Sequence, residues 1–171
     1  MTPTQTNLIA CLPSSKEFAE KVQICIHNTL QNSRPFFIIL VNIANLESFE
    51  KRRSGLEALS LMRDIGMAVR NVVHPSQFVG FFQSGLGLVF DAVDPGNLDK
   101  IAQRLAIVIQ NAIRASHCND FQGRWSDIIF QFLHPNDPGI VYPKVGWAIY
   151  PRDGEDINKL IARAQFIIAQ P

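Results

Sequence analysis

The chain has 171 residues, of which 47% are hydrophobic and 18% are charged, and its formal net charge is +1. This length is enough for one domain with a sizeable core, and the composition excludes an intrinsically disordered chain. The near-neutral charge gives no reason to expect a nucleic-acid or membrane-surface partner. We therefore expect a single domain over residues 1–171, with residues 1–8 as a flexible leading segment.

The three cysteines, Cys11, Cys25 and Cys118, are widely spaced and form no CxxC pair. An odd count at such spacing argues against a disulfide framework and favours a reducing compartment. The apolar run at 35–43 is far shorter than a membrane span, and the N-terminus lacks the basic-then-apolar order of a signal peptide. We expect a cytoplasmic protein, or a cytoplasmic part of a larger one.

Hydrophobic spacing predicts the elements of the first half of the chain. Apolar residues at helical intervals predict a first helix over 18–30. A β-branched and aromatic run over 36–43 predicts a strand buried on both faces. A wide apolar stripe then predicts a long helix over 54–73 that lies across a sheet.

In the second half, two apolar segments at 78–82 and 86–90 with a tight connection predict a β-hairpin. A helix is expected over 97–115, a strand over 127–133 and another strand over 145–150. The last amphipathic helix, with apolar residues between 157 and 168, is expected to be capped by Asp153 or Asp156.

This order contains a βαββαβ unit, so the predicted fold class is α+β, an α/β sandwich with a ferredoxin-like core. Its central sheet is antiparallel and helices flank it, as in the polymerase-palm and nucleotide-cyclase folds. Because many binding modules without chemistry share this core, the fold alone decides no function.

Four segments resemble, in the right order, the GGDEF domain of diguanylate cyclases, which make cyclic di-GMP from two GTP molecules. The opening LPSSKEF resembles the family's LPNRRxF, and FFIILVNIANLESF resembles its first strand and turn, FxDxDxFK. VVHPSQFVGFFQSGLGLVF resembles the helix end and signature hairpin, and VGWAIYPRDGEDINKLIARAQ resembles SIGIALYPxDGxxxxxLLxxAD. The resemblance covers nearly the whole chain.

The resemblance lies in the scaffold, whereas the residues that carry the family's chemistry are replaced. In the family, a carboxylate of the first-strand motif and one of the signature hairpin hold two Mg²⁺ ions on the GTP phosphates, because hard cations need anionic oxygens. Here the first-strand positions are Asn42 and Ala44. The signature pentapeptide falls on Gln83, Ser84, Gly85, Leu86 and Gly87. We expect no catalytic residue, no metal site and no cofactor.

The family's other ligand contacts are also unmatched. Its guanine-binding positions fall on Glu50 and Leu59, and its inhibitory RxxD motif falls on a segment that begins at His74 and ends at Gln77. A leucine makes none of the hydrogen bonds on which base discrimination depends. The resemblance therefore implies a degenerate GGDEF domain that is not an enzyme.

The role implied is a regulatory, protein-interaction or dimerisation module in bacterial cyclic di-GMP signalling. Its partner would be another protein, a second copy of the chain, or a neighbouring sensor or EAL-type domain. Phe81, Phe82 and Trp147 are the hypothetical partner surface, with the two phenylalanines filling or covering the former nucleotide cleft. The sequence does not identify which of these partners is bound.

The alternative is a receptor that binds GTP or cyclic di-GMP without turning it over, with Arg70, Arg104 or Arg114 as cationic contacts. The hairpin turn itself has two readings. Its backbone N–H groups would hold an anion, or its glycines serve only the conformation of the turn. The sequence favours the second reading, because no cation is near the turn along the chain.

Overall fold

The computed structural model describes residues 12–91, 95–120 and 141–170. The expected leading segment 1–8 and the expected strand over 127–133 lie outside the described residues. Within them, no helix is long and apolar enough to cross a membrane.

Four antiparallel strands form one sheet in the order β2-β3-β1-β4. The strands are β1 (Phe36–Ala44), β2 (Phe78–Phe82), β3 (Gly85–Asp91) and β4 (Tyr142–Tyr150). β1 lies between β3 and β4, and its first six residues are all buried, as the continuous apolar run predicts. The antiparallel sheet and the βαββαβ order confirm the predicted α+β class.

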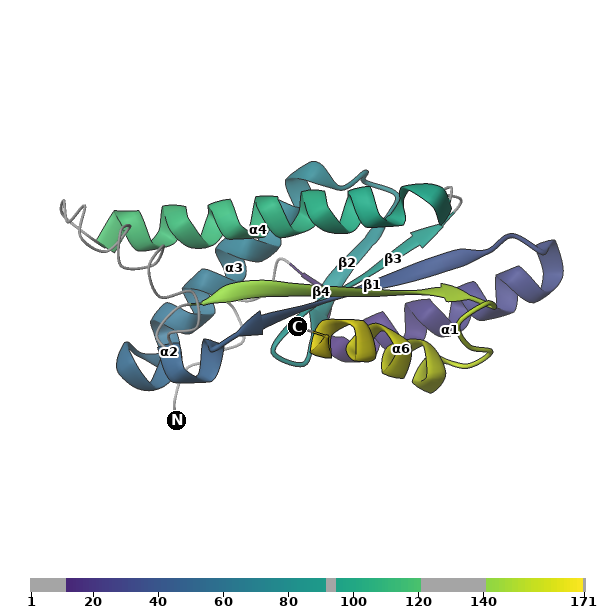
Figure 1. Cartoon of the computed structure of the whole chain (residues 1–171), viewed down its shortest axis with the longest axis horizontal. Coiled ribbons are helices and arrows are strands. Elements are labelled where there is room, and N and C mark those ends of the chain that lie inside the picture. Colours follow the sequence, from purple (N-terminus) through teal and green to yellow (C-terminus); the bar gives the residue numbers. More distant parts are fainter. Residues whose placement is uncertain (1–11, 92–94, 121–140, 171) are drawn as a thin grey trace, which may run out of the picture.

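Two helix layers cover the sheet (Figure 1). One face is covered by α1 (Ser15–Asn32) and α6 (Ile157–Ala169), and the other by α3 (Gly55–Val72) and α4 (Leu98–Asp120). Because successive side chains of a strand point to opposite faces, β1 supplies both cores in alternation. Phe37, Ile39, Val41 and Ile43 pack with α3 and α4, whereas Phe36, Ile38 and Leu40 pack with α1 and α6.

The helix starts follow from local capping. Ser14 and Glu17 form a capping box at α1, and the Ser54 hydroxyl accepts from the Glu57 N–H at α3. At α6 the cap is Asp156, whose carboxylate accepts from the Lys159 N–H at 2.9 Å. The structure thereby decides between the two caps that the sequence left open.

Two short elements were not expected, and boundaries of α1, α4 and β4 differ from the prediction by three to five residues. The short α2 (Leu46–Arg52) and the 3₁₀ turn η2 (Pro95–Asn97) were not expected, since each is too short for a clear periodic pattern. β4 begins three residues earlier than predicted and contains Pro143. A proline is tolerated in a strand that needs no hydrogen bond on its outer side, and β4 pairs only with β1 among the described strands.

Candidate functional site

The hairpin turn and the end of β1 lie side by side in the sheet. Asn42 pairs with Gly85 of β3 on one side and with Lys144 of β4 on the other. The Ser84 hydroxyl donates to Asn42 Oδ1 at 3.4 Å. The structure therefore brings Asn42 next to Ser84 and Gly85, which are about 40 residues away in sequence and were expected at the same site.

The turn itself consists of Gln83 and Ser84, and its positive φ of 50° belongs to Gln83. The expectation that glycine provides the turn's positive φ is therefore wrong. Gly85 is the first residue of β3, and a Cβ there would lie 1.8 Å from the Val41 carbonyl oxygen. Glycine is required at this position because the backbones of β1 and β3 approach so closely.

The next two positions of the pentapeptide also offer no group to solvent. The Leu86 side chain is fully buried in the core under α3 and α4. Gly87 lies under the ring of Phe18, and a Cβ there would be 2.7 Å from that ring. The resemblance places acids at Gly85 and Leu86. At Gly85 the backbone of β1 leaves no room for a side chain, and at Leu86 the side chain is packed in the core.

α6 brings one more polar side chain to the turn. Gln165 Nε2 donates to Gln83 Oε1 at 3.3 Å. α6 comes this close because Gly146 has no side chain, and a Cβ there would lie 2.0 Å from the Ala164 carbonyl oxygen. We call the five polar residues Asn42, Gln83, Ser84, Lys144 and Gln165 the hairpin-turn cluster.

Lys144 and Gln165 were not predicted as site residues. A lysine within the otherwise apolar strand YPKVGWAIY is a signal that sequence reasoning had available. Its position opposite Asn42 depends on the pairing of β4 with β1, which the sequence does not specify. Among the described residues, Lys144 is partly buried and takes part in no ion pair.

The cluster contains neutral groups and one ammonium, and no carboxylate. Ala44, the second first-strand position, contributes only a methyl group and pairs with Tyr142. Over the described part of the chain, no three His, Cys, Asp or Glu side chains are grouped so that they could hold a metal ion. The cluster is equipped to donate hydrogen bonds to an anion rather than to ligate a hard cation.

Solved structures share this architecture. The GGDEF domain of DgcB from Caulobacter crescentus, in complex with c-di-GMP, matches with a TM-score of 0.66 and 14% identity over 98% of this chain and 89% of that one. The FimX GGDEF domain from Pseudomonas aeruginosa matches with a TM-score of 0.67 and 11% identity, over 98% and 92% of the two chains. The chain has the GGDEF-domain fold.

A third structure, the diguanylate cyclase SiaD from Pseudomonas aeruginosa in complex with its activator SiaC, gives a TM-score of 0.69 and 12% identity. It is matched over 95% of this chain and 55% of that one. No protein-family model and no curated protein matches the sequence. At these identities the structural likeness establishes the fold, whereas function has to be argued from the site.

His74 and Gln77, where the resemblance places the GGDEF inhibitory motif, lie at the other end of the hairpin from its turn. His74 Nδ1 is 2.8 Å from the Ser76 hydroxyl. The Gln77 side chain accepts from the Asp91 N–H at 2.9 Å and so ties the start of β2 to the end of β3. Arg70 donates to the carbonyl oxygens of Gln77 and Pro75 at 2.7 and 3.0 Å. These groups hold the α3–β2 connection in place.

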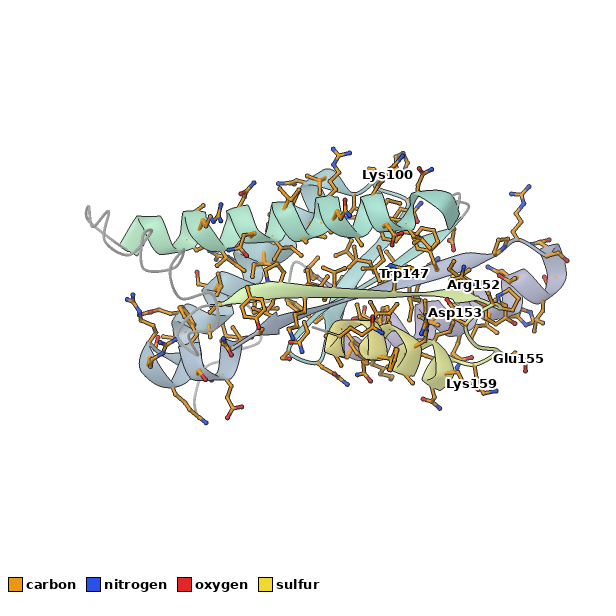
Figure 2. The ribbon with its side chains drawn as sticks, viewed as in Figure 1. Lys100, Trp147, Arg152, Asp153, Glu155 and Lys159 are labelled. Atoms are coloured by element: carbon orange, nitrogen blue, oxygen red, sulfur yellow. The ribbon has the colours of Figure 1, made fainter. Side chains whose placement is uncertain are left out.

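The hypothetical partner surface is not one continuous patch. Phe82 packs edge-on against Phe18 under α1, with ring centroids 5.2 Å apart. Phe81 packs into the core on the opposite face of β2. Trp147 lies on β4, at the other end of the strand order, and faces α4 (Figure 2). The Arg152 guanidinium lies over its ring, 5.6 Å from the centroid.

The carboxylates associated with the sheet lie at its far end, where β3 and β4 finish. Asp91 accepts from the Cys25 thiol at 3.3 Å and pairs with Lys21 at 3.5 Å. Burial, followed by the hydrogen bond to Asp91, raises the pKa of Cys25 from 9.0 to about 12.

Asp153 follows β4 at the same far end of the sheet. It accepts from the Ile149 N–H at 2.8 Å and pairs with Arg152 at 3.1 Å. Burial raises the pKa of Asp153, but the hydrogen bonds from Arg152 and from the Ile149 N–H outweigh this effect and lower the pKa overall.

Proposed function

We propose that the chain is a catalytically inactive GGDEF domain that acts as a regulatory, protein-interaction or dimerisation module in cyclic di-GMP signalling. The observation that carries this proposal is that the signature hairpin has no room for acidic side chains at the two positions where the family has them. Gly85 has no room for a side chain and Leu86 is buried, so the positions that correspond to the GGDEF acids have been absorbed into the sheet and the core.

The chemistry of the cluster supports the same conclusion. Phosphoryl transfer through two metal ions depends on carboxylates that converge on the metals and offset the charge that develops. Here Asn42 offers a neutral amide, and the ammonium of Lys144 on the paired strand would repel a divalent cation. Without the metals, the main source of transition-state stabilisation is missing.

The compared structures support a role in binding. The DgcB domain is in complex with c-di-GMP, and SiaD is in complex with its activator SiaC. A domain of this fold therefore binds the nucleotide in DgcB, and a cyclase that contains this fold binds a protein activator in SiaD. We assign this chain the role of binding a protein. The bound protein would be a separate partner, a neighbouring signalling domain or a second copy of the chain.

The deciding experiment is incubation of the purified chain with GTP and Mg²⁺ or Mn²⁺, followed by chromatography for cyclic di-GMP. We expect no product, while an active diguanylate cyclase in the same buffer provides the positive control. Formation of cyclic di-GMP above a no-protein blank would overturn the proposal. Sedimentation velocity over a range of concentrations tests the dimerisation role directly.

Lys144 favours a second candidate, a receptor that binds GTP or cyclic di-GMP without catalysis. Of the arginines first considered for this role, Arg70 is bound to backbone carbonyls of its own loop. Arg104 and Arg114 lie on α4, which covers the opposite face of the sheet from Asn42 and Lys144. A receptor that binds its ligand beside Asn42 would use Lys144, which pairs with Asn42 across β1 and β4. Calorimetric titration with each nucleotide, with and without Mg²⁺, distinguishes such a receptor from an inert scaffold.

A further inference from the structure

The sheet has two outer strands, and their outer edges differ. β2 forms one edge, where the Phe81 N–H donates to the Pro13 carbonyl oxygen at 2.7 Å, so the segment before α1 covers part of this edge. β4 forms the other edge, and among the described strands it pairs only with β1. The outer edge of a strand carries N–H and C=O groups that another strand can bind.

A contact at the end of β4 shows which of its backbone groups point outward. The Ile149 N–H donates to Asp153 Oδ2 at 2.8 Å, and the Ile149 carbonyl oxygen accepts from the Asp153 N–H at 2.8 Å. Both groups of Ile149 therefore point away from β1. Because this orientation recurs at every second residue of an antiparallel strand, the N–H and C=O groups of Val145 and Trp147 also point outward. Pro143 shares the orientation, so its missing N–H costs no bond to β1.

Val145 and Trp147 are left with outward backbone groups that bind no other described residue. Both residues are partly exposed, whereas the first six residues of β1, in the middle of the sheet, are all buried. β4 runs across the front of the molecule between α4 and α6, with no other described element before it (Figure 1). Pro143 and the Asp153 contact limit this open stretch at its two ends, so only a short segment can pair with it.

Lys144 gives the open edge a positive charge. It is partly buried, and it forms no ion pair with any residue that the structure describes. For a strand added outside β4, Lys144 is a position without direct hydrogen bonds, where opposed side chains come closest. An acidic residue opposite Lys144 would supply a counter-charge, whereas a basic residue there would be repelled.

We propose that the outer edge of β4 binds an extended acidic segment of a partner protein, which adds to the sheet as an antiparallel strand. This inference names the class of partner for the protein-binding role proposed above, and it rests on that role. In this mode of recognition, main-chain hydrogen bonds provide affinity and the opposed side chains provide specificity. Here the main-chain bonds are those to Val145 and Trp147.

The surroundings of the edge specify four consecutive residues of the partner segment. Opposite Trp147 and Val145, apolar residues would extend the core under α3 and α4, against which both side chains pack. Opposite Gly146 only a small residue fits, because α6 lies so close that a Cβ on Gly146 would be 2.0 Å from the Ala164 carbonyl oxygen. Opposite Lys144 an acid is favoured. In the direction of the partner chain, the pattern is apolar, small, apolar, acidic.

The experiment is an NMR titration of the ¹⁵N-labelled chain with a ten-residue peptide whose central residues are Val-Ser-Val-Glu. We expect saturable shifts of the Val145 and Trp147 amide signals. N-methylation of the two peptide valines removes the N–H groups that face β4 and should weaken binding about tenfold or more. N-methylation of the peptide serine, whose N–H points away from β4, is the matched control and should leave binding unchanged.

The acidic position is tested by exchanging the charges. Lys144→Glu should weaken binding of the peptide about fivefold or more, and a Val-Ser-Val-Lys peptide should bind this variant better than the wild type. The matched control is Lys16→Glu on α1, which packs on β2 and β3 and not at the β4 edge. It changes the net charge by the same amount and should leave the titration unchanged.

Several results would overturn the proposal. Slow hydrogen exchange of the Val145 and Trp147 amides in the dilute free chain would show that the edge is already paired, and protection that rises with chain concentration would assign it to a second copy. No saturable shifts, equal effects of the two N-methylations, or no recovery on charge exchange would each contradict the acidic strand. Failure of the proposed function has a different readout, the formation of cyclic di-GMP, so the two results remain separable.

Discussion

The two ends of the sheet are chemically opposite. At the hairpin-turn end, Asn42, Ser84 and Lys144 supply neutral groups and one positive charge, and the side chains of the cluster are joined by hydrogen bonds of 3.3 and 3.4 Å between neutral groups. At the far end, Asp91 and Asp153 are carboxylates held by hydrogen bonds and ion pairs between 2.8 and 3.5 Å. At the end that resembles a catalytic site, the hairpin-turn cluster contains no carboxylate.

This difference shows where the fold is stabilised and where it is free to bind. The carboxylates at the far end join helix, strand and turn, so their side chains have structural partners. The cluster at the hairpin turn is polar and partly open, and Lys144 has no ion-pair partner within the described residues. Polar groups that the fold does not use are the ones available to a ligand or partner.

The largest effect is expected from substituting Gly85 at the hairpin-turn end. Gly85→Ala places a Cβ 1.8 Å from the Val41 carbonyl oxygen and should reduce the free energy of unfolding by about 3 kcal/mol or more. Gly85→Asp, which restores an acid to the signature, should be less stable still and should not restore catalysis. Urea denaturation followed by circular dichroism measures both.

The control for this prediction is Gly55→Ala at the start of α3, where a Cβ meets only the Glu50 side chain at 3.4 Å. That change should be neutral or slightly stabilising, because alanine favours a helix over glycine. A Gly85→Asp protein that is as stable as the wild type would show that the hairpin has room for a side chain at this position.

The fold was largely predictable because apolar periodicity dominates it. The run at 36–43 is buried on both faces, and β1 spans Phe36–Ala44, so a strand in the middle of the sheet follows directly from its residues. The long helices α1 and α3 were predicted to within three residues at each end. The seven-residue α2 was missed, because two turns of helix carry too little pattern.

The second prediction tests the far end through Asp153. Asp153→Ala removes a charge-assisted hydrogen bond to the Ile149 N–H and should cost about 2 kcal/mol of stability at pH 7. Because its folded pKa is lowered, Asp153 stabilises the protein at pH values above the ordinary 3.8, and this contribution is lost as pH falls through the lowered value. The wild type and the variant should therefore converge in acid.

Glu155→Ala, two residues further along the chain, is the matched control for Asp153→Ala (Figure 2). It removes the same charge from an exposed position and should change the stability by less than about 0.5 kcal/mol. Equal losses in the two variants at pH 7 would show that net charge, and not the hydrogen bond of Asp153, is responsible.

The third prediction concerns the stability that Cys25 provides at alkaline pH, also at the far end of the sheet. The pKa of Cys25 is about 12 in the folded chain against an ordinary 9.0, so the neutral thiol stabilises the fold below pH 9. This contribution should decline as pH rises from 9 towards 12, by at most about 1.4 kcal/mol per pH unit. The difference in unfolding free energy between wild type and Cys25→Ala, measured at pH 8, 9 and 10, isolates it from other titrating groups. A difference that stays constant over this range would show that burial and Asp91 do not raise the pKa.

The candidate site was only partly predictable. The positions of Asn42, Ser84 and Gly85 follow from the resemblance, and the structure places them together. The resemblance aligns Lys144 and Gln165 with two motif positions of the family but does not predict them as site residues, since their place depends on how β4 pairs and on how closely α6 approaches at Gly146. Register and close backbone contact are tertiary properties that a local pattern does not encode.

The smallest effect, and the most direct test of the cluster geometry, is the pair Asn42→Asp and Lys144→Gln. Asn42→Asp places a carboxylate directly opposite Lys144 and should stabilise the protein by about 0.2–1 kcal/mol at low salt. A double-mutant cycle should assign this gain to the pair, and 1 M salt should remove most of it, because the side chains are partly solvated. A coupling energy of zero would place the Lys144 ammonium away from Asn42 and would deprive the hairpin turn of its cation. Asn42→Asp should still make no cyclic di-GMP, since one carboxylate without a converging partner does not hold two metal ions.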